Sequence, residues 1–359
     1  MPLIDESGPV RAGEELDVSA VDAFLKGAIP SLLGTPALTQ FPGGASNLTY
    51  LLRYANRELI LRCPPRGHKA ASAHDMLREA RIMAALRPVY PLVPEILAVC
   101  DDPSMLGAPF YAMERLRGLI LRRDLPEGLV LGREGVRQLC LNVLDQLIAL
   151  HEVDWKAAGL ESLGKGEGYV RRQVEGWTAR YRAARTSDAA DFEGVLAWLA
   201  ARMPSQDSAT RLIHNDYRFD NVVLDPEDPL KVIGVLDWEM ATLGDPLMDL
   251  GNTLAYWVQA DDDPAFRSLR RQPTHLKGML TRDEVIRYYG DRTGQDLPGF
   301  SFYLAFGYFR LAAIAQQIYF RYARGETTNP DFATFAQLTH VLEGRCLKLM
   351  AGGAESERP

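Results

Sequence analysis

The chain has 359 residues, of which 47% are hydrophobic and 24% are charged, and its formal net charge is −7. This length exceeds the size at which one hydrophobic core normally keeps growing, so we expect two lobes. The negative charge balance argues against a sequence-independent nucleic-acid binder, because such a protein needs a basic face.

Targeting and redox signals are equally informative. The N-terminal residues are acidic and lack the apolar core of a signal peptide, and no apolar run approaches the ~18 residues of a membrane span. The four cysteines form no Cys-x-x-Cys pair, which predicts buried thiols rather than a zinc site or a disulfide framework. We therefore expect a cytoplasmic protein that binds neither membrane nor nucleic acid, with the oligomeric state left open.

The first third of the chain is predicted to be rich in strands. Residues 47–54 and 58–63 have β-forming composition and are separated by a short turn, which indicates a hairpin. A helix is expected over residues 74–86, where apolar side chains recur at helical spacing. Two further strands are expected over residues 95–100 and 109–116, joined by a turn-forming segment.

After Gly118 the pattern becomes mainly helical. Helices are predicted over 133–151, 169–185 and 190–202, and short strands over 212–214, 221–225 and 231–237. A Thr-x-x-Glu pattern at Thr281 and Glu284 predicts a capped helix start. We expect an α+β protein with a small β-rich lobe at residues 1–115 and a larger, mainly helical lobe at residues 116–359.

Three polar side chains around the short strands fit phosphoryl transfer. Such transfer depends on positioning and on neutralising charge, and Mg²⁺ prefers hard oxygen ligands. Asp216 could accept the proton of an attacking hydroxyl, while Asn221 and Asp237 offer oxygens to Mg²⁺. The strands at 221–225 and 231–237 should form a hairpin that brings Asn221 close to Asp237. The plainer alternative is that polar loops simply join buried strands.

The ordered motifs HNDYRFDN, VIGVLDWE and GDPLMDLG resemble the aminoglycoside phosphotransferase and choline kinase-like family, relatives of protein kinases. The resemblance extends over roughly residues 35–345 and implies a two-lobed protein-kinase-like fold with ATP and Mg²⁺. It assigns Asp216 as the catalytic aspartate, and Asn221 and Asp237 as metal ligands. It implies that His214 packs the loop and that Asp249 supports it through hydrogen bonds, while Asp245 begins a helix.

The same resemblance implies a nucleotide site in the β-rich lobe. The conserved kinase lysine is replaced by Arg62, and its partner would be Glu79. Arginine keeps the charge and can fork onto phosphate or carboxylate, but the pair could also be an ordinary surface ion pair. Main-chain groups of Met113, Glu114 and Arg115 would contact adenine. The phosphate-covering loop would include the residues Gly43, Gly44, Ser46 and Asn47, although a glycine pair between strands can also be only a turn.

The acceptor is expected to be a small-molecule hydroxyl, because the D-F-G and A-P-E signatures of protein kinases are missing. The sequence around these motifs is similar to that of kinase-like modules fused ahead of acyl-CoA dehydrogenases and of relatives linked to hydroxyacyl-CoA phosphorylation. One alternative is a catalytically silent nucleotide-binding module. Another is an aminoglycoside phosphotransferase, which would need an acidic acceptor groove; the acidic run at 261–263 offers charges of unknown position.

Two further features stay open or are set aside at this stage. Arg310 lies within an otherwise apolar helical segment, so it is either paired inside the core or reaches a polar pocket. Residues 164–168, GKGEG, look like a phosphate loop but lack the GxxxxGK[ST] order and have no strand before them. We interpret that segment as a connection between helices.

Overall fold

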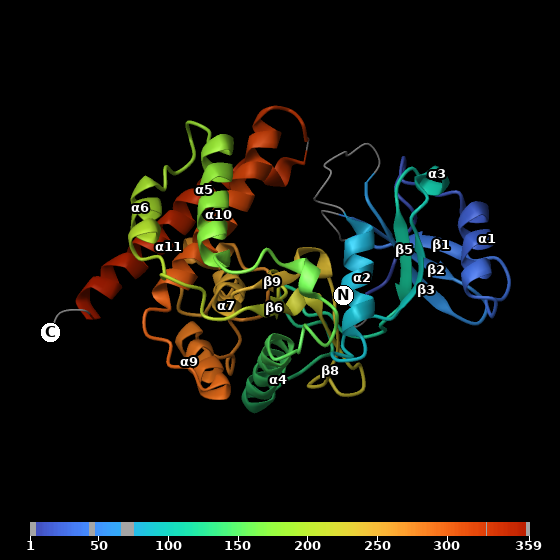
Figure 1. The fold of residues 1–359 in the computed structure, drawn as a ribbon, viewed down its shortest axis with the longest axis horizontal. Helices are drawn as coiled ribbons and strands as arrows, with labels where there is room; N and C mark the ends of the chain where they lie inside the picture. Colours follow the sequence, from blue (N-terminus) through green and yellow to red (C-terminus); the bar gives the residue numbers. More distant parts are fainter. Residues whose placement is uncertain (1–4, 43–46, 66–74, 328, 357–359) are drawn as a thin grey trace.

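The computed structural model describes residues 5–42, 47–65, 75–327 and 329–356, with side chains described to residue 352. An antiparallel sheet forms the smaller part, on the right of Figure 1, and helices form most of the larger part. The strands of the antiparallel sheet lie in the order β1-β2-β3-β5-β4. They are β1 Ala37–Gln40, β2 Leu48–Arg53, β3 Glu58–Cys63, β4 Ile96–Cys100 and β5 Phe110–Glu114. The expected α+β, two-lobed architecture is confirmed.

The β2–β3 hairpin confirms the first strand prediction. The Tyr54 N–H donates to the Arg57 carbonyl over 2.8 Å and closes the turn. Side chains in paired strands alternate between the two faces of a sheet. Leu51 accordingly belongs to the core that the sheet shares with the larger part, whereas Leu52 packs in a separate core on the opposite face.

One helix covers each face of this sheet (Figure 1). Helix α2 (Met76–Leu86), which was predicted, lies between the sheet and the larger part, and Met76 contributes to the shared core. Helix α1 (Val18–Ala28) packs on the outer face through Val21 and Leu25. Sequence analysis missed α1, although Asp17 caps its first turn by accepting hydrogen bonds from two backbone amides.

The larger part is built from long helices joined by short helical turns. The helices are α4 Arg133–His151, α5 Tyr169–Ala184, α6 Glu193–Ala201, α7 Pro246–Ala255, α9 Arg282–Thr293, α10 Ser301–Ala323 and α11 Phe335–Ser356, with the shorter α8 Pro264–Ser268. The short helix α3 Pro103–Leu106 belongs to the smaller part, between β4 and β5 (Figure 1). The 3₁₀ turns are η1 Glu161–Leu163, η2 Phe219–Asn221, η3 Trp238–Met240 and η4 Pro330–Thr334. Over the described part of the chain, none of these helices has both the length and the apolar character needed to cross a membrane.

Two small antiparallel sheets lie where the two parts meet. Strand β7 (Val222–Leu224) pairs with β8 (Val232–Val235), which confirms the predicted second hairpin. Strand β6 (Arg211–Ile213) pairs with β9 (Thr242–Gly244), and β9 was not predicted. The loops that leave β6 and β8 therefore emerge next to each other, although they are far apart in sequence.

Two helix starts follow their local sequence signals. Thr281 and Glu284 form the predicted capping box at α9. The Asp245 carboxylate accepts a hydrogen bond from the Leu247 N–H at 2.8 Å and so begins α7. Residues 164–168 connect η1 to α5, as the sequence indicated.

Helices α7 and α10 cross closely because glycines face each other at the contact. A Cβ atom at Gly307 would collide with the carbonyl oxygen of Gly251 and would press on Ala255. A Cβ at Gly251 would in turn collide with the carbonyl of Tyr303. The close crossing fixes the face of α10 that points toward the C-terminal end of α7.

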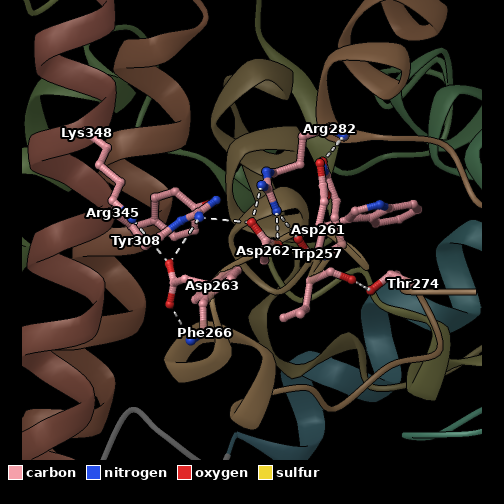
Figure 2. A network of polar contacts seen from close by, with 12 residues as sticks. Trp257, Asp261, Asp262, Asp263, Phe266, Thr274, Arg282, Tyr308, Arg345 and Lys348 are labelled. Atoms are coloured by element: carbon pink, nitrogen blue, oxygen red, sulfur yellow. Dashed lines mark hydrogen bonds and ion pairs between the residues drawn. The ribbon is translucent and has the colours of Figure 1, made fainter.

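Two residues of the acidic run at 261–263, Asp262 and Asp263, make internal contacts that tie α8 to α9 and α11 (Figure 2). Asp262 is 7% exposed and accepts hydrogen bonds from two guanidinium nitrogens of Arg282 at 2.8 and 2.7 Å. Its carboxylate also lies 2.9 Å from Arg345. Asp263 caps α8 by accepting a hydrogen bond from a backbone amide. The carboxylates of Asp262 and Asp263 therefore hold helices together, whereas Asp261 is exposed and accepts a hydrogen bond from the Gln259 side chain at 3.1 Å.

Candidate active site

A buried ion pair joins the sheet to α2. Arg62 lies near the end of β3, and its Nη1 is 3.1 Å from Oε1 of Glu79. The side chains are 11% and 1% exposed, which excludes the alternative of an ordinary surface pair. Burial raises the pKa of Glu79, and the Arg62 charge opposes that shift. Burial also disfavours the charge on Arg62, but the Glu79 carboxylate raises its pKa overall, so the guanidinium stays protonated.

The same guanidinium reaches across to the larger part. Its Nη2 lies 3.3 Å from Oδ1 of Asp237, the residue that begins η3 after β8. Asp237 has a φ of 67°, a left-handed conformation that is uncommon for residues other than glycine. Asn215 also has a positive φ, of 65°. Backbone strain of this kind clusters at functional sites and persists because the surroundings hold it.

The loop between β6 and β7 is held from below by Asp249 in α7. Its two carboxylate oxygens accept hydrogen bonds from the N–H groups of His214 and Asn215, each at 2.7 Å. Oδ2 also lies 3.1 Å from Nε2 of His151. Burial would raise the pKa of Asp249, but the hydrogen bond with His151 and the loop amides lower it overall. A charged, fully buried aspartate thus fixes the start of the loop.

His214 is itself part of the support. It is fully buried, its Nε2 donates to the Leu236 carbonyl at 3.0 Å, and its Nδ1 accepts from the Asp216 N–H at 3.3 Å. Its ring packs against Trp238 with centroids 4.9 Å apart. Both ring nitrogens bind main-chain groups, so this histidine holds the loop at Asp216 next to Leu236, the residue that follows β8 by one position.

Asp216 projects from this supported loop and is 20% exposed. Asn221 ties the loop together, because its Nδ2 donates to the Asp216 main-chain oxygen at 2.8 Å and to Oδ2 at 3.2 Å. Arg218 lies on the other side, with its Nη2 3.3 Å from the same Oδ2. The second carboxylate oxygen of Asp216 is the one left for an incoming group.

Asn221 and Asp237 are brought together by the β7–β8 hairpin. Val222 pairs with Val235, and the Leu236 N–H donates to the Asn221 main-chain oxygen at 2.8 Å. Because the Asn221 Nδ2 is committed to Asp216, its side-chain oxygen is left as an acceptor. Asp237 is 32% exposed and uses Oδ1 for Arg62, which leaves Oδ2. Two hard oxygens at one edge are a donor set that fits Mg²⁺ together with phosphate oxygens.

The remaining nucleotide-site predictions divide into two groups. Gly43, Gly44 and Ser46 lie outside the described residues. Asn47 is described; it is 1% exposed, and its Nδ2 donates to Oε2 of Glu239 at 2.8 Å across the two parts.

The segment expected to contact adenine comprises the last two residues of β5 and the residue that follows it. Met113 is 6% exposed, and the Glu114 N–H donates to the Glu95 carbonyl at 2.9 Å. The Arg115 side chain is 7% exposed and lies 2.7 Å from Glu58. The side chains of Glu114 and Arg115 thus have protein partners, the former through Arg87 at 3.1 Å. Any adenine contact here would use main-chain groups other than the Glu114 N–H.

A family model described as "Phosphotransferase enzyme family" matches residues 37–285. The chain belongs to this family. The match includes the Arg62–Glu79 pair, the supported loop with Asp216, and the Asn221–Asp237 edge.

Curated relatives of this family member carry dehydrogenase names and are much longer. It is 38% identical to mouse (Mus musculus) acyl-CoA dehydrogenase family member 10 over 94% of its own length and 32% of that protein. It is 32% identical to human (Homo sapiens) acyl-CoA dehydrogenase family member 11 over 88% of its length and 40% of that protein. The chain therefore spans between about a third and two fifths of these two relatives.

Solved structures agree with the family assignment. A putative aminoglycoside phosphotransferase from Ralstonia eutropha superposes with a TM-score of 0.79 and 28% identity, over 93% of this chain and 98% of that one. A choline kinase from Cryptosporidium parvum superposes with a TM-score of 0.62 at 11% identity, over 94% and 97%. An aminoglycoside phosphotransferase in ternary complex with AMP-PNP and hygromycin B superposes with a TM-score of 0.57 at 15% identity, over 94% and 99%. The last two likenesses concern the fold alone, which is protein-kinase-like.

Sequence analysis of this phosphotransferase-family chain missed Arg218. Besides Asp216, its guanidinium contacts Asp220 at 3.3 Å and lies 4.7 Å from the ring centroid of Tyr256. Burial disfavours the Arg218 charge, but Asp216 and Asp220 raise its pKa overall. The signal available in sequence was a cation placed between two aspartates in the DYRFD segment.

It also missed Arg78, which fastens α2 to the turn after Asp237. Its guanidinium donates to the main-chain oxygens of Glu239, at 3.1 Å, and of Ala241. Arg78 directly precedes Glu79, so its side chain projects from a different face of α2. The local sequence therefore gave no signal for a contact with a residue more than 160 positions away. Together with the contact between Asn47 and Glu239, it joins the two parts beside Asp237.

Proposed function

We propose that this chain is an ATP-dependent phosphotransferase that moves the γ-phosphate of ATP to a hydroxyl of a small molecule. The observation that carries the proposal is the convergence of Asp216, Asn221 and Asp237 opposite the buried Arg62–Glu79 pair. Residues 1–115 would hold the nucleotide, and residues 116–359 would supply the catalytic loop and the acceptor site. The expected partner is a small-molecule alcohol.

Asp216 acts on the acceptor. Its free carboxylate oxygen accepts the proton of the acceptor hydroxyl, while the hydroxyl oxygen forms a bond to the γ-phosphorus. The bond between that phosphorus and the bridging oxygen breaks, and ADP leaves. Arg218 restrains the other carboxylate oxygen at 3.3 Å, so Asp216 keeps one orientation toward the acceptor. Such assistance is typically worth about 10²–10⁴ in rate.

Arg62 positions the nucleotide. Its guanidinium is directed by Glu79 on one side and by Asp237 on the other. A fixed, permanently charged fork of this kind can bind phosphate oxygens. Asn221 and Asp237 would hold Mg²⁺, which neutralises phosphate charge when it is bound.

The relatives support one class of acceptor. Proteins named as acyl-CoA dehydrogenase family members contain a region similar to this chain, which supports a hydroxyacyl-CoA or a related metabolite as acceptor. The aminoglycoside alternative needs an acidic acceptor groove, and two of the three carboxylates at residues 261–263, those of Asp262 and Asp263, are engaged in internal contacts instead.

The test is ADP release from Mg·ATP with hydroxyacyl-CoAs, free hydroxy acids, amino alcohols and aminoglycosides as acceptors. Asp216→Asn should lower kcat at least about a hundredfold with nearly unchanged Mg·ATP affinity. Asp225→Asn, at an exposed ion pair with Lys231, is the matched control and should leave kcat unchanged. Turnover by Asp216→Asn within a few-fold of the unmodified protein would refute the role of Asp216. Mg·ATP binding without turnover of any acceptor would favour the silent nucleotide-binding alternative.

A further inference from the structure

Arg310 is a buried cation that has no hydrogen-bond or ion-pair partner in the described part of the chain. It lies in the middle of α10 and is 5% exposed. Its guanidinium lies 5.3 Å from the ring centroid of Trp177 in α5, and no hydrogen bond or ion pair joins it to another described residue. Arginine carries five N–H donors and stays protonated, so an arrangement of this kind leaves strong donors unused.

The helix crossing shows where Arg310 lies. Gly307 faces Gly251 and Ala255 of α7, and residues three apart share a helix face. Arg310 is therefore on the side of α10 that runs past the end of α7, where Tyr256 follows Ala255. The Tyr256 ring in turn stacks on Arg218, which contacts Asp216. Arg310 thus lies on the side of the structure that holds Tyr256, whose ring is next to the Arg218 that contacts Asp216.

Electrostatics agree with this placement. Burial raises the pKa of Tyr256, the Asp216 carboxylate adds to the shift, and the charges of Arg218 and Arg310 oppose it. Burial likewise raises the pKa of Tyr169, while its hydrogen bond to Asn215 and the Arg310 charge oppose that shift. Arg310 therefore lies close enough to influence residues on both sides of the catalytic loop.

The neighbouring carboxylates do not neutralise Arg310, because each has other partners. Asp216 is paired with Arg218, Asp249 accepts from two loop amides, and Asp245 accepts from the N–H and hydroxyl of Ser208. A positive charge with unused donors consequently remains in the helical part, near Tyr256 and Tyr169.

We propose that Arg310 determines acceptor specificity by donating hydrogen bonds to an acyl oxygen of the acceptor while its hydroxyl lies at Asp216. This inference rests on the proposed phosphotransfer. The acyl oxygen can belong to a free carboxylate or to a thioester carbonyl, since a guanidinium can donate to both. A neutral alcohol without an acyl group would leave the donors unused, and a polycationic acceptor would be repelled.

The test compares matched acceptors rather than single compounds. We would use hydroxy acids of short and medium chain length, their CoA thioesters, and the diols with the same carbon skeletons. Binding is measured by calorimetry in the presence of Mg·ADP, and turnover by ADP release from Mg·ATP. The full-length protein is compared with Arg310→Met and Arg310→Lys, and Arg321→Met at an exposed position of α10 is the control.

The expected result is selective. The unmodified protein should bind the acid or the thioester more tightly than the diol, and Arg310→Met should weaken that binding about 10- to 100-fold. Diol and Mg·ATP binding should stay within about twofold, Arg310→Lys should be intermediate, and Arg321→Met should be unchanged. A larger loss with the acid identifies a carboxylate, and a larger loss with the thioester identifies a carbonyl.

Three outcomes would overturn the inference. The first is an equal loss of affinity for acid, thioester and diol in Arg310→Met, which would indicate a packing role. The second is equal binding of all three by the unmodified protein. The third is an unchanged affinity for all three in Arg310→Met. Turnover and binding separate this inference from the proposed function. Selective loss of acyl binding without any ADP release would refute phosphotransfer and keep the role of Arg310, whereas normal turnover by Arg310→Met would do the reverse. If Arg310→Met no longer binds Mg·ATP, the binding of acid, thioester and diol by Arg310→Lys is compared instead, and the same outcomes apply.

Discussion

The buried Arg62–Glu79 pair separates a contribution to stability from a contribution to nucleotide binding. Glu79→Gln removes the carboxylate that faces Arg62 and leaves the guanidinium, which is 11% exposed, with Asp237 alone. Arg62→Met/Glu79→Met removes both charges and keeps similar side-chain volume. The double variant should be more stable than Glu79→Gln, but it should bind Mg·ATP less tightly.

The magnitude follows from burial. Breaking a buried pair by removing one partner typically costs about 3–5 kcal/mol, because an uncompensated charge stays inside. Asp237 still lies 3.3 Å from Arg62 and is 32% exposed, so we expect the lower end of that range for Glu79→Gln. The double variant buries no unpaired charge there and should regain roughly 1–2 kcal/mol relative to Glu79→Gln. It lacks the guanidinium that we propose binds the phosphates, so its Mg·ATP affinity should fall at least about tenfold.

Thermal unfolding and calorimetric titration with Mg·ATP would measure the two effects. The control is Glu193→Gln, which breaks the exposed pair with Arg182 and should change the unfolding temperature far less. Equal destabilisation by Glu79→Gln and by the double variant would refute the argument from burial. Unchanged Mg·ATP affinity in the double variant would refute the role of Arg62 at the phosphates.

Two further predictions concern the proposed role of Asp237 as a metal ligand and the support of the Asp216 loop by Asp249. Asp237→Ala should weaken binding of Mg·ATP much more than binding of metal-free ATP, as measured with and without EDTA; equal weakening would count against a ligand role. The pKa of Asp249 is lowered in the folded state, so the unfolded chain takes up this proton at a higher pH than the native chain. The stability from this carboxylate is present above about pH 4 and is lost as the pH falls toward its native pKa. The difference in unfolding free energy between the unmodified protein and Asp249→Asn should therefore shrink below about pH 4, and a constant difference would contradict the assignment.

Much of the fold could be predicted from local patterns. The β-forming composition of residues 47–54 and 58–63 around a short turn predicted the β2–β3 hairpin, and the Thr281–Glu284 pattern predicted the start of α9, because both signals act between near neighbours. Helix α1 and strand β9 were missed. Strand β9 has three residues and is defined by its pairing with β6, so its own sequence carries little signal.

The sequence by itself determined which chemical groups are available: the order of Asp216, Asn221 and Asp237, and an arginine on the strand that precedes α2. Tertiary structure decided which of them meet. Arg62 reaches Asp237 across 175 positions, Arg78 reaches the turn after Asp237, and Arg310 packs against the Trp177 ring without an ion pair to any described residue. The physical reason is that hydrogen bonding and side-chain periodicity specify local geometry, whereas the distance between two remote side chains depends on how whole helices and sheets pack.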